Sequence, residues 1–234
     1  MTKRSTAGGK DTRASIIDAA ERVFAEKGFY GASLREICTV AGIRPGLLHY
    51  YFESKEPLFE TTVTRRADEM RAIFNRCIDD VVAARAGHPS PTDLCRAYIR
   101  FFFDLSRSRG DGWRSYITLL TQTAAAYDVD IVRNMLRGFD FIAERMTIEF
   151  ARASPWAPDE AIRASLFYLE CAVTTALVSS GLHSVRTRTV DADAVWDRLA
   201  DDMARFFARG MAVDTARGAE LASRDASSAP VSDG

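Results

Sequence analysis

The stretch from Ser33 to Lys55 constrains the fold of this 234-residue chain more than any other. Ser33 suits the N-cap of a helix, because its side-chain oxygen accepts an amide hydrogen of the first turn, and Glu36 three residues later completes the capping-box pattern. Gly42 ends such a helix in the left-handed conformation, and Pro45 suits the first turn of the next helix. The stretch therefore predicts two short helices around a tight turn.

The second helix of this pair has one apolar face. Leu48 and Phe52 lie four residues apart on that face. The other faces carry Arg44, Leu47, Tyr50 and Tyr51. Two compact helices around a glycine-containing turn form a helix-turn-helix pattern, whose second helix has the size of the DNA major groove. The spacing alone also fits an ordinary helical hairpin of a bundle, so it leaves both interpretations open.

The residues themselves carry a resemblance to a known family. The run A-G-I-R-P-G-L-L-H-Y-Y-F-E-S-K-E-P-L, from Ala41 to Leu58, resembles the DNA-binding signature of tetracycline-repressor-like (TetR family) transcriptional regulators. Ile16 to Ile37 resembles the first helix of that family and its Gly-aromatic turn. The residues that match the signature are Ala41, Gly42, Gly46, Leu48, Phe52, Ser54, Lys55, Glu56 and Leu58. The departures, which leave the operator sequence open, are Cys38, Pro45, Leu47 and His49.

The resemblance implies an all-α fold of about nine helices. An N-terminal three-helix, helix-turn-helix DNA-binding domain would precede a C-terminal helical domain for ligand binding and dimerisation. We expect a disordered basic arm over residues 1–10, the DNA-binding domain over 11–57 with its motif at 33–52, the helical body over 58–211 and a disordered tail over 212–234.

Hydrophobic periodicity independently predicts helices along the whole body, with no strand pattern and no internal repeat. We expect a first helix from Thr12 to Lys27, ended by Gly28, and one long helix that Ser54 caps and that runs to about Ala86. A helix of about 30 residues spans about 45 Å and could join the head mechanically to the body. The later helices are expected over 92–109, 113–127, 128–153, 159–183 and 191–210.

Composition and charge limit the function classes. The net charge is −1, but residues 1–50 carry eight lysines and arginines against five acids, so a few placed cations would meet DNA phosphates. The sequence shows no run of about 20 apolar residues and no secretory signal, which predicts a cytoplasmic protein without a membrane partner. The four cysteines and three histidines are scattered, so we expect buried free thiols, no metal site and no cofactor.

Specific side chains are expected at the DNA. Arg35 and Arg44 are candidates for base edges, since arginine forms a bidentate pair with guanine. The resemblance also places Pro45, Leu47, His49 and Tyr50 near the groove, where Pro45 or Leu47 could pack on a thymine methyl. Candidates for phosphate contacts, which set the register on the duplex, are Ser33, His49, Tyr50, Tyr51 and Lys55.

The helical body has two expected roles. Homodimerisation through the two C-terminal helices, 159–183 and 191–210, is favoured by small residues on the first and by Phe206-Phe207 on the second. A hydrophobic small-molecule effector is expected in an apolar pocket among the middle helices. The candidate lining residues are Phe102, Trp113, Tyr116, Leu120, Phe139, Tyr168, Cys171 and Thr175, with Phe141, Thr121, Gln122 and Thr123 as further candidates.

The sequence thus predicts a ligand-responsive transcriptional repressor that binds double-stranded operator DNA. An activator with the same head, or a helical small-molecule binder that no longer reads DNA, would share these features. An enzyme is disfavoured, because no nucleophile elbow, Walker loop, G-x-G-x-x-G or metal cluster is present in the sequence.

Overall fold

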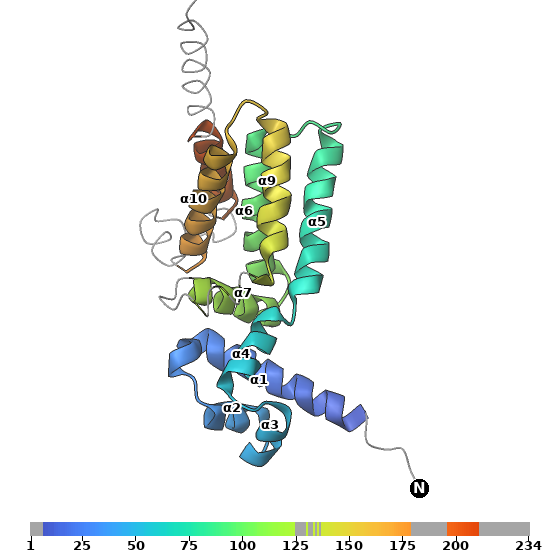
Figure 1. Cartoon of the computed structure of the whole chain (residues 1–234), viewed down its shortest axis with the longest axis vertical. Helices are drawn as coiled ribbons and strands as arrows, with labels where there is room; N and C mark the ends of the chain where they lie inside the picture. The colour runs from blue at the N-terminus through green and yellow to red at the C-terminus, as the bar shows by residue number, and fades with distance from the viewer. Residues whose placement is uncertain are drawn as a thin grey trace, which may run out of the picture. The chain divides into compact units, whose positions relative to one another are not determined.

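The computed structural model describes residues 7–124, 130, 133, 135, 137–178 and 196–210. Every regular element in these ranges is a helix, which confirms the predicted all-α fold (Figure 1). In chain order the helices are α1 (Ala7–Gly31), α2 (Leu34–Ala41), α3 (Pro45–Tyr51), α4 (Lys55–Thr64), α5 (Ala67–Ala84), α6 (Pro91–Ser108), α7 (Asp111–Ala124), α9 (Asp140–Ala153) and α10 (Asp159–Val178), followed by helical residues 196–210.

The chain divides into two compact units, each assembled from separate stretches of sequence. The first unit comprises Met1–Ala72 and Asp104–Asp140, and the second comprises Ile73–Phe103 and Phe141–Gly234. In the first unit α1 contacts α2, α4 and α7, and α4 contacts α7. The expected boundary between residues 57 and 58 differs from this division, because α4 and α7 pack on α1, which also contacts α2 of the helix-turn-helix motif (α2 and α3, called the reading motif below).

The core of the first unit forms on the apolar stripe of α1. Ile16, Ala20 and Phe24 are buried there. The ring of Phe24 meets Phe59 of α4 edge-on at 5.0 Å between centroids, and Phe59 meets Phe29 at the same separation. Full burial of a large apolar side chain contributes about 1.5–3 kcal/mol to folding, so these rings hold α1 and α4 together as one frame.

The two ends of α1 differ in how well the sequence predicts them. Gly28 has φ 68° and ψ 178°, which interrupts the helix where the sequence predicts its end. A positive φ costs glycine little, since it has no Cβ. The start is earlier than expected: Ala7 is already helical, so the part of the expected disordered arm from Ala7 to Lys10 belongs to α1. The remainder of that arm lies outside the described residues.

The expected long helix from Ser54 to about Ala86 is broken, because Arg65 and Arg66 separate α4 from α5. Arg65 pairs with Asp18 of α1 at 2.6 Å. Glu21, also on α1, lies 3.1 Å from an Arg65 nitrogen and 3.6 Å from Arg66 Nε. The two arginines anchor the chain to α1 at the point where α4 ends and α5 begins. The hydrophobic periodicity of the sequence cannot predict such a tertiary contact.

Glu21 is the buried centre of this charge cluster. Burial raises the pKa of the Glu21 carboxyl above its ordinary value of 4.5, against the attraction of Arg65 and Arg66. The Arg66 guanidinium also lies over the ring of Trp113 in α7, 5.1 Å from its centroid, a cation–π contact. The cluster therefore ties α1, the break between α4 and α5, and α7 at one point.

Aromatic rings and ion pairs hold the second unit together. Phe74 of α5 lies edge-on to Phe101 of α6 at 5.0 Å and to Phe141 of α9 at 6.2 Å. Arg145 of α9 donates to Asp79 of α5 at 2.7 Å. These contacts join residues that are 27 to 67 positions apart in the sequence, so the core of this unit depends on non-local pairing.

Helical residues 196–210 pack against α6 in the second unit. Phe103 and Trp196 lie edge-on with their ring centroids 4.4 Å apart. Arg96 Nε donates to Asp201 at 2.8 Å, and a nitrogen of Arg100 lies 3.5 Å from Asp197. This helix is therefore fixed on one side by α6.

Several expected boundaries in the second half differ from the structure or lie outside it. A turn at Gly138 and Phe139 precedes α9, so the helix expected over 128–153 is not continuous. The helix expected over 159–183 is described up to Val178, and the one over 191–210 is described from residue 196. The expected disordered tail, 212–234, lies outside the described residues.

The cysteines do not all behave as the sequence suggests. Cys38 and Cys95 are buried, as expected, and burial raises the pKa of the Cys95 thiol to about 12. Cys77 is half-buried, and Cys171 is exposed on α10, which corrects the expectation for that residue. Within the described ranges, no three His, Cys, Asp or Glu side chains gather as they would around a metal ion.

Candidate nucleic-acid interface

The start of α2 is fixed by Ser33, as predicted. Ser33 has extended backbone angles, and its Oγ accepts the Glu36 amide hydrogen at an N–O distance of 3.2 Å. The reciprocal half of the expected capping box is replaced by another contact: the Glu36 carboxylate pairs with Nζ of Lys27. Because Lys27 lies at the end of α1, this ion pair connects α1 to the first turn of α2.

The turn between α2 and α3 follows the prediction closely. Gly42 adopts the left-handed conformation, with φ 68° and ψ 30°, and its amide donates to Thr39 O at 3.2 Å. Ile43 N donates to Cys38 O at 3.0 Å, which satisfies another carbonyl at the end of α2. Pro45 is the first residue of α3. These groups set the direction in which α3 leaves the turn.

One face of α3 is buried and the others are exposed. Leu48 and Phe52 are buried in the first unit. Tyr50 is 79% exposed and Leu47 is 40% exposed, although both are apolar or aromatic. Tyr51 is half-buried, and its ring lies edge-on to Tyr50 at 5.1 Å. The remaining exposed candidates on α2 and α3 are Ser33, Arg35, Arg44, Pro45 and His49.

Lys55, expected at a phosphate, has a structural task in this fold. Its Nζ donates to Phe29 O at 2.8 Å and to Ala32 O at 3.1 Å. The ammonium also lies 4.4 Å from the centroid of the Phe29 ring. Lys55 therefore ties the start of α4 to the connection between α1 and α2, and contact of its third N–H with a phosphate stays a prediction.

Arg13 is an interface candidate that the sequence motif does not contain. It is exposed on α1, and its guanidinium carbon lies 5.2 Å from the centroid of the Phe52 ring at the end of α3. An exposed cation beside α3, the helix expected to read DNA and called the reading helix below, is well placed to bind a DNA phosphate. Arg13 is 39 residues before Phe52 in the sequence, so their proximity comes only from tertiary packing, which no local pattern reveals.

The residues predicted to line an effector pocket have different environments. Trp113, Tyr116 and Leu120 are buried on α7 in the first unit, and Tyr116 Oη donates to Val63 O at 2.5 Å. Phe139 is half-buried at the turn before α9. Phe102 is also half-buried, and its ring lies beside those of Tyr98 and Phe101 in the second unit.

Three of these predicted pocket residues are exposed on α10, namely Tyr168, Cys171 and Thr175. They are therefore more exposed than residues of an enclosed pocket would be, and their role in effector binding stays a prediction. The buried stripe of α10 consists of Ile162, Leu166, Leu169 and Val173, and the helical period places the three on the other side. Phe167 and Val178 share the exposed surface.

The α10 helix bears on the expectation of no membrane span without overturning it. Its 20 residues include a window with a mean hydropathy of 1.4, so within the described chain this one helix is long and apolar enough to cross a membrane. Soluble proteins contain core helices that pass the same test, so the observation is weak support for a span.

Comparisons with known proteins agree with this geometry. Residues 16–62 match the family described as bacterial regulatory proteins, tetR family, and residues 96–210 match the tetracyclin repressor-like C-terminal domain. The transcriptional regulator BetI of Rhizobium meliloti is 35% identical over 91 residues, which cover 39% of this chain and 41% of BetI. The chain thus matches about two-fifths of the length of this relative.

Solved structures extend the likeness to most of the fold. A TetR-family regulator from Agrobacterium tumefaciens has a TM-score of 0.63 at 19% identity, with 84% of this chain and 97% of that one covered. FadR of Bacillus subtilis in complex with stearoyl-CoA has a TM-score of 0.59 at 15% identity, with 84% and 98% covered. With both of its regions matched and its helical fold shared, the chain belongs to the tetR family of bacterial regulatory proteins.

Proposed function

We propose that this protein is a ligand-responsive DNA-binding transcriptional regulator, a repressor that leaves its operator when a hydrophobic small molecule binds. The observation that carries the proposal is α3, a short helix held from behind by buried Leu48 and Phe52 while Leu47, His49 and Tyr50 face solvent. An exposed apolar or aromatic side chain on a rigid helix gains stability only against a partner surface. The major groove accepts a helix of this size.

Within this function, the arginines read bases and the polar side chains hold phosphates. Arg44 precedes α3 and Arg35 lies on α2, both exposed, and each guanidinium suits O6 and N7 of guanine. Ser33, Tyr51 and the newly located Arg13 suit phosphate oxygens, which fix register without reading sequence. Pro45 and Leu47 offer apolar contact to thymine methyl groups.

A homodimer completes the reading head. Two copies of α3 must lie about 34 Å apart to meet successive major grooves, and pairing of two chains supplies that spacing. The exposed side of α10, with Phe167, Tyr168 and Val178, and the exposed Phe206 in the second unit supply apolar surface for this contact. We assign the membrane-like composition of α10 to this interface, in a protein that acts on DNA in the cytoplasm.

The effector is proposed to be a hydrophobic molecule bound in the helical body. FadR, a structural relative, is crystallised with stearoyl-CoA, a ligand with a long apolar acyl chain on a charged coenzyme A group. Trp113, Tyr116 and Leu120 form an apolar wall on α7 in this chain. Binding changes DNA affinity only if the effector prefers the arrangement that does not fit DNA, which defines repression relieved by ligand.

Fluorescence anisotropy with the full chain and labelled DNA from the flanks of its own gene tests the proposal. Wild-type protein should bind one sequence with a strong salt dependence. Arg35→Ala and Arg44→Ala should each lose about 1–3 kcal/mol of binding free energy and relax the sequence preference. Arg114→Ala, which removes an exposed arginine from α7, is the matched control and should leave affinity unchanged.

Two results would contradict the proposal. One is an absence of duplex binding by the wild-type dimer at low salt. The other is equal loss in Arg44→Ala and Arg114→Ala, which would make the effect one of net charge. In vitro transcription from the bound promoter then shows whether the protein represses or activates. An increase in transcription when the protein is added would mean that it is an activator and not a repressor.

A further inference from the structure

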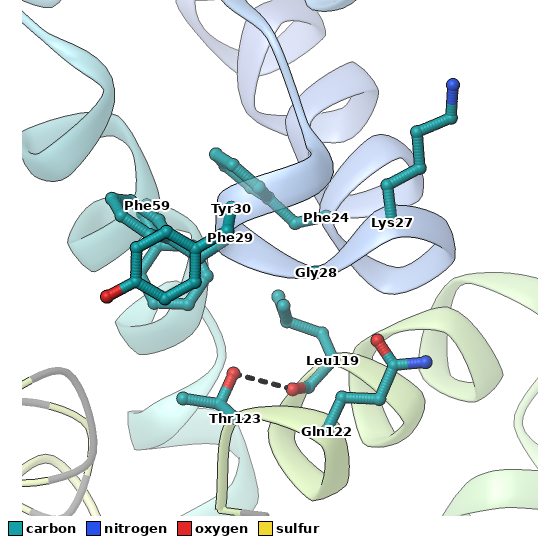
Figure 2. Close-up of a pocket in the computed structure, with 9 residues that line it drawn as sticks. All are labelled: Phe24, Lys27, Gly28, Phe29, Tyr30, Phe59, Leu119, Gln122 and Thr123. Carbon is teal, nitrogen blue, oxygen red and sulfur yellow. Dashed lines mark hydrogen bonds between the residues drawn. The ribbon is translucent and has the colours of Figure 1, made fainter. Parts of the chain in front are cut away.

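A small cavity in the first unit is lined by Gln122 and Thr123, two of the further effector candidates, and by none of the eight main candidate lining residues. It has a volume of about 160 Å³ and lies between α1, α4 and α7 (Figure 2). Aromatic rings form much of the wall on the side of α1 and α4, and the side chains of α7 close the other side. Its lining residues are Phe24, Lys27, Gly28, Phe29, Tyr30, Phe59, Leu119, Gln122 and Thr123.

We propose that this cavity binds a small uncharged aromatic molecule that carries one hydrogen-bond donor, as a phenol or an indole does. A cavity of comparable size lined by aliphatic and aromatic side chains holds benzene in another protein, so the volume suits one or two rings. The rings of Phe24, Phe29 and Phe59 already meet at 5.0–6.3 Å between centroids, and a further ring continues the same packing.

The polar groups of the lining favour a donor on the ligand. Thr123 Oγ1 donates its hydrogen to Leu119 O at 2.7 Å, so the hydroxyl oxygen is left as an acceptor (Figure 2). Gln122, which is half-exposed, brings an amide to the same side of the cavity.

The charge next to the cavity is neutralised. The Lys27 ammonium points away from the cavity in Figure 2 and pairs with Glu36, so the stem of Lys27 contributes to the wall and its charge does not. A carboxylate on the ligand would therefore find no open cation among these lining residues, and a neutral molecule fits better.

Two wall residues connect the cavity to the reading motif. Lys27 pairs with Glu36 in the first turn of α2. Phe29 accepts a hydrogen bond from Lys55, which begins α4 directly after the reading helix α3. An occupant that shifts either wall residue therefore acts on the elements that flank α3. This coupling to DNA affinity rests on the proposed function, whereas the site itself does not.

Phenol and benzene, titrated into the full-length protein by ligand-observed NMR and calorimetry, test the site. Both should bind saturably to wild type, and phenol should bind more tightly because its hydroxyl can donate. Thr123→Val keeps the shape and removes the acceptor, so it should weaken phenol about fivefold to tenfold, the size of one neutral hydrogen bond, and leave benzene unchanged.

The matched control is Thr121→Val. Thr121 is buried on the same helix and also donates to a carbonyl four residues back, Ile117 O, but it does not line the cavity. Its substitution should change neither affinity. If Thr123→Val proves unstable, Gln122→Leu at the half-exposed rim provides a second measurement of how much a polar group of the lining contributes to phenol affinity. Equal phenol affinity in wild type, Thr123→Val and Gln122→Leu, or no saturable binding of either probe, overturns the site.

Anisotropy measurements with and without phenol separate the site from the coupling. A phenol-dependent change of DNA affinity in wild type, reduced in Thr123→Val but retained in Thr121→Val, supports the coupling. Unchanged DNA affinity with phenol bound overturns the coupling and leaves the site. Failure of the wild type to bind DNA at all overturns the proposed function, and the titration alone then decides the site.

Discussion

The reading helix α3 and the long helix α10 both expose aromatic side chains, but the residues around these side chains differ. On α3, Tyr50 is 79% exposed beside His49 and follows Arg44 at the start of the helix. On α10, Tyr168 is 61% exposed beside Phe167, and the exposed surface continues through Glu170, Cys171 and Thr175 to Val178. The first surface mixes cationic, polar and apolar groups, and the second is mostly apolar.

This difference indicates the partner of each surface. A groove of DNA offers phosphates, base edges and methyl groups, so a mixed surface on a short rigid helix complements it. A second protein chain offers an apolar face, so an apolar helix surface complements that. In both helices the exposed residues depend on a buried row behind them, Leu48 and Phe52 on α3 and Leu166 and Leu169 on α10.

The strongest test of this comparison separates the two faces of α3. Leu48→Ala removes a fully buried side chain and should lower the free energy of unfolding by about 2–5 kcal/mol, because it leaves a cavity in the core. Leu47→Ala, one position earlier and 40% exposed, should change it by less than about 0.5 kcal/mol and still weaken DNA binding. Urea denaturation and anisotropy measure the two effects. Equal losses of stability would mean that α3 has no distinct outer face.

The next test concerns α10. Tyr168→Glu places a charge in the apolar surface and should weaken dimerisation by about 2 kcal/mol or more, as at a hot spot. Trp156→Glu is the control: Trp156 is equally exposed, at 62%, but lies in the loop between α9 and α10. Sedimentation velocity should show dissociation of the first variant alone. If both variants dissociate, or neither does, the α10 surface is not the interface.

A third test compares two carboxylates, one in each unit. Burial raises the pKa of Glu21 above 4.5, so its stabilising contribution is full below that value and is lost as pH rises through the folded pKa. Burial alone would raise the pKa of Asp93 too, but hydrogen bonds from Ser90 and Arg85 lower it below 3.8. The contribution of Asp93 is therefore present above 3.8 and is lost as pH falls through the folded pKa.

Urea denaturation over a pH series distinguishes the two groups. Glu21→Gln should flatten the decline of unfolding free energy above pH 4.5, since the amide does not ionise. Asp93→Asn should flatten the decline below pH 3.8 and leave the upper range unchanged. Each variant is the control for the other. A change of slope in the same pH range for both would show that the two environments do not differ as their contacts indicate.

The same contrast between local and non-local contacts explains what the sequence could predict. The cap at Ser33, the turn at Gly42 and the buried face of α3 depend on neighbours within a few residues, and the structure confirms all three. The break after Thr64 depends on Arg65 and Arg66 meeting α1, more than 40 residues earlier, and periodicity continues through it.

The candidate site divides in the same way. The exposed residues of α2 and α3 follow from helical spacing, whereas Arg13 reaches Phe52 only through packing. The structural role of Lys55 could not be predicted from the sequence either, because its partners are the backbone carbonyl groups of Phe29 and Ala32, which any residue could supply. The exposure of Tyr168, Cys171 and Thr175 on α10 could not be predicted either, since an apolar pattern does not state which face of a helix a neighbour covers.

The smallest expected effect compares two serines at helix starts. Both occupy N-cap positions, but Ser33 accepts an amide hydrogen from α2, whereas the hydroxyl of Ser54 donates to the Glu56 carboxylate and caps no amide of α4. Ser33→Ala should therefore lower the free energy of unfolding by about 1 kcal/mol, and Ser54→Ala by less. Thermal and urea melts of the two variants measure this difference. Equal losses would show that the hydrogen bond from Glu36 N to Ser33 contributes no more to stability than an exposed contact between side chains. The rigidity of the motif would then come from the turn at Gly42 and the buried Leu48.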